Sequence, residues 1–572
     1  RVKPMRILSL TALVAFALAG LAANAGAQTV VTANVTANTT WGGAANPSPI
    51  VLQNPIFVTN NATLTILPGT IVRGQPRTGP VIVGSTVGTP GALIVTQTGR
   101  IVANGSAASP IVMTTAAVDN DDNGVADDVD SNGFEDAWVS GDLFLDDTPT
   151  TAPLAPLNKT GFANVALWGG VVILGNAPTN NAAKAGVGYG KTIAEGLTVP
   201  GFPAANATYG GIEPHDNSGS LKFVSIRHAG DELGDGNELN GLSLGGVGDG
   251  TTIENIDVYC NFDDGVEWFG GTVNGRRLMV SFVGDDMFDL DEGYTGVNQF
   301  LFGIMPFFNE NGGTAYGSAS GDKAGEFDGD NYRPDNTALN GNVNTRVGVD
   351  GTAIDGTPWP LSNPVMYNMT LIGSTPDAPA FFAPVSSAAT NRGIQMRNGF
   401  AGTVASSIVI NTGSEEGLEI APSAAGGETP GFDVTANTTA GRIALACSTF
   451  DDTGTLDATE LLASTNGNTL QTSQGGLANS ANTVNVAAFP GLVNEDQTFD
   501  PTGNPAGKLD LGLKASAINP RPNSGLTGTG GCVAPQGPGL ASVTYRGAFD
   551  RTASLLWTTD WTALSIGGVL AD

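Results

Sequence analysis

Two short acidic segments lie 22 residues apart and carry carboxylates at matching positions. They read Asp263-Asp264-Gly-Val-Glu267 and Asp285-Asp286-Met-Phe-Asp289, and Asp291 and Glu292 follow the second. If the segments stack in the fold, their carboxylates lie about 5 Å apart and repel one another unless a cation or protons intervene. The pattern therefore predicts a ladder of acids that needs a partner.

Three interpretations of this acidic ladder remain open. The aspartates cap turns by accepting backbone hydrogen bonds, or the ladder holds a cation or another ligand. The third interpretation is catalytic, because glycosidases use two carboxylates about 5–10 Å apart. Its candidates are Asp264, Glu267, Asp286 and Asp289. We find no arginine base with acid or lysine support, which argues against a calcium-dependent lyase.

A second acidic segment has the spacing of a calcium loop. It runs from Asp119 to Asp136, with side-chain oxygens at alternating positions and a glycine at the sixth position of each of two overlapping units. Such a loop wraps around one hard cation, and the units resemble calcium repeats of thrombospondin-type and dockerin-like modules. The candidate Ca²⁺ ligands are Asp119, Asp121, Asn123, Val125 (through its carbonyl), Asp127, Asp128, Asp130, Asn132 and Asp136. The alternative is a solvated acidic loop.

Other familiar chemistry finds no support in the sequence. The two histidines, His215 and His228, have no spacing suited to zinc. No G-x-S-x-G nucleophile motif is present, and the glycine-rich run 245–250 lacks the lysine and helix of a phosphate loop.

The elements that carry these residues are short strands. Alternating apolar runs of four to six residues are separated by Gly, Asn and Asp along most of the chain, which indicates an all-β protein. The acidic segments themselves repeat with a period near 22 residues, which fits one coil of three strands and three turns. The sequence therefore predicts a right-handed parallel β-helix, in which equivalent residues of successive coils stack.

Several motifs carry a family resemblance from about residue 40 to the C-terminus. They are 61–70, 107–115, Trp168–Gly175, Asn237–Gly246, Asp263–Gly271, Asn363–Gly373 and Val543–Phe549. Together they resemble an uncharacterised family of bacterial secreted and surface β-helix proteins with the pectate-lyase-like superfold. The resemblance implies this fold and location, and it implies no reaction.

The chain is strongly acidic and carries an export signal. Lys and Arg number 24 against 54 Asp and Glu, a net charge of −30, which excludes a general nucleic-acid binder. Residues 1–27 combine basic residues, an apolar stretch and a small-residue cleavage site, as in a signal peptide. We expect a secreted protein, extracellular or at the outer surface, with the periplasm as an alternative, and no transmembrane segment in the mature chain.

The predicted organisation after the signal peptide has four parts. Residues 28–118 form N-terminal coils, 119–160 the acidic calcium-loop insertion, 161–415 the central β-helix, and 416–572 the last coils and a cap. Cys447 and Cys532 are candidates for a disulfide in an oxidising compartment, whereas Cys260 belongs to an apolar strand and is expected to be buried.

These observations favour a structural, adhesive or glycan-binding protein without catalytic activity. Its expected partner is a polysaccharide or a cell-surface glycan, and its expected cofactor is structural Ca²⁺. The alternative is a polysaccharide hydrolase or lyase that uses the acidic ladder at 263–292.

Overall fold

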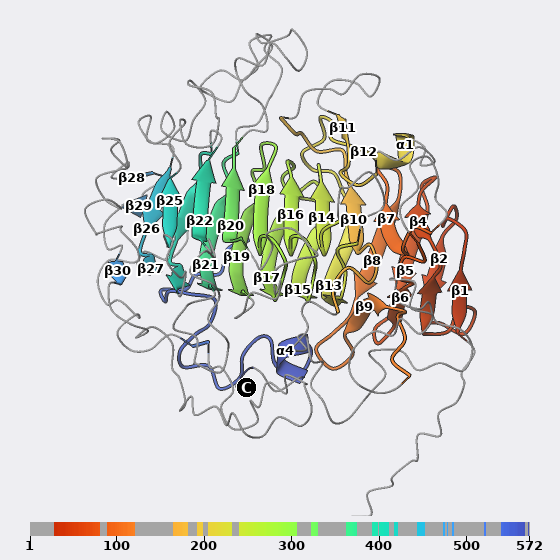
Figure 1. Cartoon of the computed structure of the whole chain (residues 1–572). Helices are drawn as coiled ribbons and strands as arrows, with labels where there is room; N and C mark the ends of the chain where they lie inside the picture. Colours follow the sequence, from red (N-terminus) through yellow and green to blue (C-terminus); the bar gives the residue numbers. More distant parts are fainter. Residues whose placement is uncertain are drawn as a thin grey trace, which may run out of the picture.

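The architecture was obtained as a computed structural model, whose strands stack side by side along one axis (Figure 1). The structure describes residues 28–79, 88–120, 164–180, 191–197, 204–231, 239–305, 322–329, 362–373, 392–397, 400–410, 417–420, 443–451, 473–474, 477–478, 483–485, 520–521, 539–566 and 570. No described helix is both long and apolar enough to cross a membrane.

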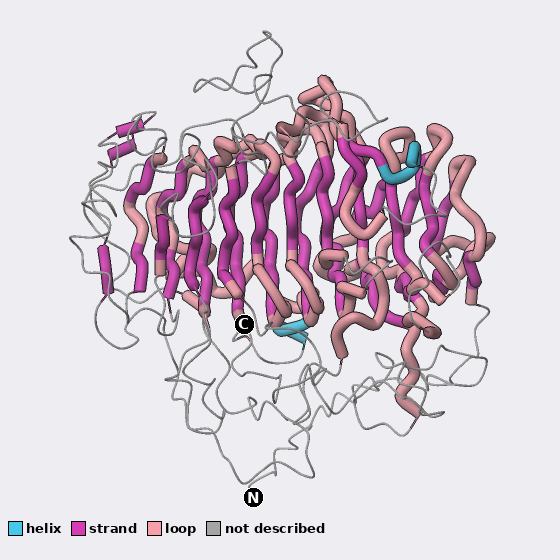
Figure 2. Tube along the Cα trace, turned by 45° about the horizontal axis from the view of Figure 1, so that its top comes forward, coloured by secondary structure: helices cyan, strands magenta, loops and turns pink. Residues whose placement is uncertain are grey.

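One face of the coils is a parallel sheet of nine strands, each paired with the equivalent strand of the next coil. In order they are β4 (Pro55–Val58), β7 (Ala92–Val95), β10 (Val171–Leu174), β14 (Leu242–Gly245), β16 (Val266–Phe269), β18 (Phe288–Asp291), β20 (Lys323–Asp328), β22 (Arg392–Arg397) and β25 (Leu418–Ile420). Sequence order equals spatial order, as the labels in Figure 1 show. Figure 2 shows the strands of successive coils lying side by side.

The other two faces form one parallel sheet of 17 strands. Its strands are β1 (Thr29–Val31), β2 (Thr39–Trp41), β3 (Ile50–Leu52), β5 (Thr63–Ile66), β6 (Ile71–Gly74), β8 (Arg100–Asn104), β9 (Ile111–Thr115), β13 (Gly219–Arg227), β15 (Thr252–Tyr259), β17 (Asn274–Ser281), β19 (Val297–Ile304), β21 (Val365–Ile372), β23 (Thr403–Ala405), β24 (Ile408–Ile410), β26 (Ala444–Ala446), β27 (Thr449–Asp451) and β30 (Thr483–Asn485).

The two faces of this large sheet meet at a column of residues in the left-handed conformation. In each of the long strands one residue has φ between 48° and 65°, and the pairing register skips it. The column comprises Phe223, Asn255, Arg277, Phe300 and Asn368. Because one left-handed residue redirects an extended chain, each long strand supplies both faces of its coil.

Small elements complete the described fold. β11 (Thr192–Ile193) and β12 (Thr208–Tyr209) form an antiparallel pair near α1 (Ala204–Ala207). β28 (Ser473–Gln474) pairs with β29 (Leu477–Ala478), and α4 (Ala563–Ile566) lies near the C-terminus.

The interior is built from columns of apolar side chains that follow the pairing register. Along the nine-stranded sheet one such column contains Leu244, Trp268, Leu290, Phe327 and Met396, all fully buried. Each side chain of this size stabilises the fold by about 1.5–3 kcal/mol through burial. The alternation that buries these residues turns their neighbours outward, which is how the acidic side chains of β16, β18 and β20 reach the outer face.

The outer faces are covered unevenly. Over β4, β7 and β10 the outward residues are apolar and cluster with residues of 191–197 and 204–209, the stretches that contain β11, α1 and β12. On the large sheet, outward side chains such as Met279 and Phe302 cluster with Phe549, Leu556 and Leu564. Phe549, Leu556 and Leu564 belong to residues 539–566, here called the C-terminal segment. This segment lies along the flank of the coils beside β15 (Figure 1).

The structure confirms the predicted all-β chain and the parallel β-helix. Cys260 is a free, fully buried thiol, as expected for a residue of an apolar strand. Cys447 is disulfide-bonded, and Cys532 lies outside the described residues, as do 121–163, which hold most of the predicted insertion.

Candidate functional site

The outward residues of the nine-stranded sheet form polar columns across successive coils. Pairing aligns one column in the order Ser243, Glu267, Asp289, Glu326, Gln395 and Glu419. Asp264, Asp286 and Lys323 form a second column, just before or at the start of their strands. We refer to these outward side chains, with Asp263, Asp285, Asp291, Asp322 and Asp328 beside them, as the acidic face.

The densest part of the acidic face is a triad of carboxylates from two coils. One carboxylate oxygen each of Asp264, Glu267 and Asp289 lies within 4.8 Å of the other two. Asp264 and Glu267 are buried, and Asp289 is partly exposed. The Oδ1 atom of Asp289 is buried without a hydrogen-bond partner. These acids could hold a metal ion, since hard divalent cations take carboxylate oxygens as ligands.

Two further groups of three carboxylates adjoin this triad and meet the same distance criterion. They are Asp263 with Asp264 and Asp285, and Asp285 with Asp286 and Asp322. The acidic face is therefore a continuous strip across the coils of β16, β18 and β20.

Part of each aspartate is engaged with the backbone of the next coil. Asp264 Oδ1 accepts a hydrogen bond from the Asp286 amide at 2.8 Å, and Asp286 Oδ1 accepts one from the Lys323 amide at 2.6 Å. These bonds join successive coils, 22 and 37 residues apart in the chain, and so differ from the local turn caps considered in the sequence analysis. They fix one oxygen of each carboxylate and bring the side chains into register one coil apart.

The triad is electrostatically costly in its ionised form. Burial raises the pKa of Asp264, Glu267 and Asp289 well above the usual range, and neighbouring carboxylates raise these pKa values further. Burial likewise raises the pKa of Asp285 to about 6. Buried like charges of this kind require protons or a cation.

The far end of the acidic face contains its own cations. Lys323 Nζ lies 3.5 Å from Asp286 Oδ2, 2.6 Å from Asp322 Oδ2 and 3.1 Å from Glu326 Oε1. Arg397 pairs with Glu326 at 2.7 Å and with Asp328 at 2.7 Å. The negative charge is thus compensated at β20 and β22. Among the described residues no ion pair joins a basic side chain to the Asp264–Glu267–Asp289 triad, and the charge of Arg397 acts on Asp289 without direct pairing.

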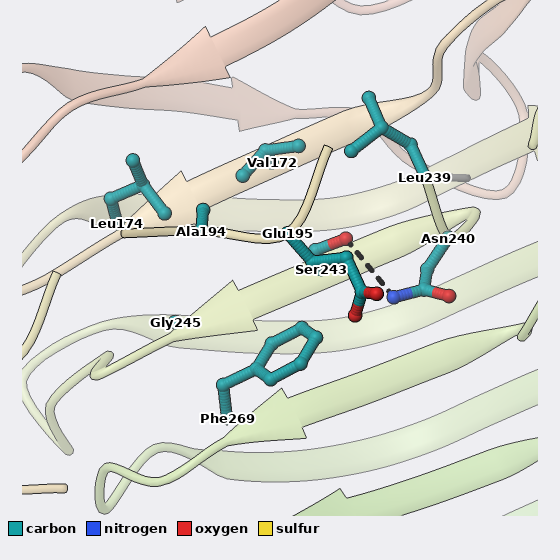
Figure 3. A pocket seen from close by; sticks show the side chains of 9 residues that line it. All are labelled: Val172, Leu174, Ala194, Glu195, Leu239, Asn240, Ser243, Gly245 and Phe269. Atoms are coloured by element: carbon teal, nitrogen blue, oxygen red, sulfur yellow. Dashed lines mark hydrogen bonds between the residues drawn. The ribbon is translucent and has the colours of Figure 1, made fainter. Parts of the chain in front are cut away.

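A pocket opens beside Glu267, between the apolar and acidic parts of the sheet (Figure 3). It is a small hollow of about 10 Å³, which leaves room for about one water molecule. Val172, Leu174, Ala194 and Leu239 form its apolar wall. The carboxylate of Glu195 and the amide of Asn240 point toward one another across it, and Phe269 faces them. The pocket therefore joins an apolar surface to a polar rim.

Asn240 links this pocket to the triad. Its Nδ2 donates to Ser243 Oγ at 3.3 Å and also to Glu267 Oε2, while its Oδ1 is buried without a partner. Tyr209 closes the neighbouring surface, because its ring packs where a side chain on Gly245 would lie and its hydroxyl donates to Glu292 at 2.8 Å. Burial raises the pKa of Tyr209, and Glu292 raises it further.

The family of the fold follows from comparison with known domain families. The model described as the pectate-lyase-like beta helix domain matches residues 33–125 and 159–489, about three quarters of the chain. The chain belongs to this family. Searches of curated proteins and of solved structures found no match. The acidic face of this pectate-lyase-like β-helix lies within the second matched range.

The structure brings together all four candidate catalytic residues of the ladder, since they belong to neighbouring coils of the β-helix. Of the predicted calcium-loop ligands only Asp119 is described. It is buried just beyond β9, and Asp121, Asn123, Val125, Asp127, Asp128, Asp130, Asn132 and Asp136 lie outside the described residues. The calcium loop therefore stays a prediction.

Sequence reasoning missed Lys323, Glu326, Arg397 and Asn240. Lys323–Asp328 is a third copy of the acidic pattern, with acids at its fourth and sixth positions as in Asp286–Asp291. It escaped notice because lysine replaces the first aspartate and the copy begins 37 residues after Asp286 rather than 22. The carboxylate spacing alone is the signal that could have found it.

Proposed function

We propose that this β-helix is an exported, non-catalytic binding protein whose acidic face holds Ca²⁺ and presents it to a glycan. The observation that carries the proposal is the triad of Asp264, Glu267 and Asp289. Three converging carboxylates, largely buried and without an ion pair to any described basic side chain, are the donor set of a hard cation.

The surroundings of the triad favour a fixed cation over a fluctuating cluster of acids. The Asp286 amide holds Asp264, and the Asn240 amide holds Glu267, so both carboxylates are oriented before an ion arrives. A divalent cation then replaces the protons that burial otherwise imposes. Ca²⁺ is the expected ion because it accepts irregular oxygen shells of six to eight ligands.

A glycan is the expected partner because the triad leaves coordination positions open. Three carboxylates do not fill a shell of six to eight ligands, and the partly exposed Asp289 gives access from outside. The pocket with Phe269 and the Glu195–Asn240 rim lies alongside Glu267. The pocket is too small to enclose a sugar, so the glycan would lie over its mouth. An apolar surface beside polar groups there suits a sugar, which presents both a C–H face and hydroxyls.

A polysaccharide hydrolase is the second candidate. The observation that favours it is the raised pKa of neighbouring buried carboxylates, since a glycosidase needs one protonated acid beside a second carboxylate. Glu267 and Asp289 are the residues that would serve. Ca²⁺ bound to the triad would occupy these same oxygens, so the two candidates make opposite demands on the site.

The leading proposal is tested by titrating Ca²⁺ into the chelator-treated protein and measuring binding by isothermal titration calorimetry. Asp289→Asn removes one ligand and should abolish one binding equivalent per chain. The matched control is Asp249→Asn, which changes an exposed aspartate paired with His215. Its calcium stoichiometry should equal that of the wild type, and any ion in the 119–136 loop is common to all three proteins.

The glycan part is tested by affinity electrophoresis on a panel of polysaccharides. Retardation should require Ca²⁺ and should disappear with chelator or with Asp289→Asn. Equal calcium stoichiometry in wild type and Asp289→Asn would contradict the metal site. Release of reducing ends that Asp289→Asn abolishes would establish the hydrolase instead.

A further inference from the structure

The acidic face contains two equivalent positions one coil apart. The first is the triad of Asp264, Glu267 and Asp289. Moving each member one coil along its column gives Asp286, Asp289 and Glu326, because Asp264 stacks on Asp286, Glu267 pairs with Asp289, and Asp289 pairs with Glu326. Asp289 belongs to both positions. The group that balances the carboxylates at one position therefore indicates what kind of group the other position binds.

The second position is already filled by a cation of the chain. The Lys323 ammonium contacts Asp286 and Glu326 at 3.5 and 3.1 Å, and it also contacts Asp322 at 2.6 Å. The lysine side chain is only 7% exposed. A lysine is almost never buried in this way unless its charge is paired.

We propose that the ammonium of Lys323 is a tethered counter-ion that occupies a second cation position of the acidic face. The face then has two cation positions in a row, and Lys323 leaves only the first open to a free ion. The inference deepens the proposed function, on which it rests only for the identity of the ion at the first position.

The column that contains Lys323 supports this assignment. Asp264 and Asp286 occupy the same place in the two preceding coils, and each accepts a hydrogen bond from the next backbone amide. At the third coil the residue changes from acid to base, and the ammonium turns back toward the acids. The exchange keeps the bond from the Lys323 amide to Asp286, and it replaces a carboxylate that accepts a backbone hydrogen bond with an ammonium that donates to carboxylates.

The charges around Lys323 favour its protonated form. Burial lowers the pKa of Lys323, but the charges of Asp286, Glu326 and Asp322 outweigh this effect and the pKa is raised. Arg397 pairs with the same oxygen of Glu326, Oε1, at 2.7 Å, so Glu326 has two cationic neighbours. Removal of the ammonium would leave the carboxylates of Asp286 and Asp322 facing one another beside Glu326, which stays paired with Arg397. Asp289 lies close by, so carboxylate oxygens would again converge as they do in the first triad.

The test is the number of calcium ions bound per chain by wild type and Lys323→Met. Equilibrium dialysis with elemental analysis measures this number directly, and the melting temperature is followed over a calcium titration. Lys323→Met should bind one more Ca²⁺ than the wild type. It should melt lower than the wild type in chelator and recover most of that loss in millimolar Ca²⁺.

Two controls accompany this variant. Lys222→Met removes an exposed lysine 3.9 Å from Glu254 on the other sheet and should leave the calcium number unchanged. The double variant Lys323→Met with Glu326→Gln removes the ammonium and also one carboxylate of the second cation position. It should therefore fold without gaining an ion.

The outcomes separate this inference from the proposed function. A wild-type chain whose triad binds no Ca²⁺ would contradict the proposed function, yet a gain of one ion in Lys323→Met would still support the tethered counter-ion. An unchanged calcium number in Lys323→Met would overturn the inference. A Lys323→Met chain that stays unfolded in millimolar Ca²⁺ would overturn it too, because no free ion would then replace the ammonium.

Discussion

At the scale of single residues, the acidic face shows two ways of keeping carboxylates close together. At β20 a lysine and, one coil on, an arginine supply permanent positive charge. At the Asp264–Glu267–Asp289 triad no basic side chain of the described part of the chain forms an ion pair, so we expect protons or a free cation to supply the charge. Lys323 thus marks a boundary on the acidic face. On its side the charge of the carboxylates is balanced by the chain itself, and on the side of the triad the balance depends on the pH and on the cations in solution.

This division predicts how stability depends on pH. An acid with a raised folded pKa contributes stability that is fully present below its unfolded pKa near 4 and is lost as the pH rises through its folded pKa. For Asp285 this window runs from about 4 to about 6, and for Asp264, Glu267 and Asp289 it extends well above the usual range. In chelator the melting temperature should therefore fall as the pH rises from 5 to about 8.

Calcium should remove most of that dependence, because the bound ion replaces the protons. At about 100 times its dissociation constant, an ion stabilises the folded state by about 2.7 kcal/mol. Differential scanning calorimetry over this pH range, with and without Ca²⁺, measures both effects, and Asp264→Asn should flatten the slope in chelator. A melting temperature that rises with pH in chelator would show that the acids are stabilised in their ionised form.

At the scale of elements, each coil built on one of the five long strands contains one residue in the left-handed conformation. Only glycine adopts this conformation without strain, and asparagine tolerates it better than most residues. Asn255 and Asn368 fit this rule, whereas Phe223, Arg277 and Phe300 do not. Packing offsets part of their strain, since Phe223 contacts Trp561 with ring centroids 5.4 Å apart and Arg277 pairs with Glu254 at 2.9 Å.

Substitution at Asn255 tests this role. Asn255→Val places a β-branched residue at a φ of 57° and should lower the free energy of unfolding by about 1–2 kcal/mol. Asn255→Gly should be close to neutral, because the backbone conformation is then relaxed. Urea unfolding measures both, with Thr252→Val in the same strand as a control of ordinary φ. Equal effects of Asn255→Val and Thr252→Val would show that the left-handed turn stores no strain.

The sequence predicted the elements better than it predicted the completed site. The repeat at 263–271 and 285–293 was enough to predict the coil, the stacking and the proximity of Glu267 and Asp289. Both segments lie in consecutive coils with similar turns, so their period is visible. Lys323 and Asn240 belong to coils of different length, and a column in register need not be periodic in sequence. No local pattern reveals which distant residue fills such a column.

At the scale of the whole molecule, the C-terminal segment ties several coils together. The Ala563 amide donates to Asp257 of β15 at 2.9 Å, and the Ala548 amide donates to Thr370 of β21 at 2.8 Å. The Phe549 ring packs edge-on against Phe302 of β19, with centroids 4.9 Å apart. The apolar outward residues of the large sheet are therefore part of a second, smaller core.

Phe549→Ala tests how much this second core contributes. The phenyl ring is 2% exposed, and its loss should lower the free energy of unfolding by about 3 kcal/mol and expose apolar surface to a fluorescent dye. Leu555→Ala is the control, because Leu555 is 63% exposed in the same segment. Equal free energies of unfolding for the two variants would show that the packing of the C-terminal segment against the coils contributes nothing to their stability.

The chain separation of these contacts sets the order of events during synthesis. Asp257 and Ala563 are 306 residues apart, and translation at about 5–20 residues per second needs roughly 15–60 s to span them. Each early coil can pair with its predecessor as it emerges, but its flank stays uncovered for that whole interval. The central coils therefore pass through a stage at which apolar outer side chains meet water, and a chaperone that shields this flank would act on a nearly complete β-helix rather than on an unfolded chain.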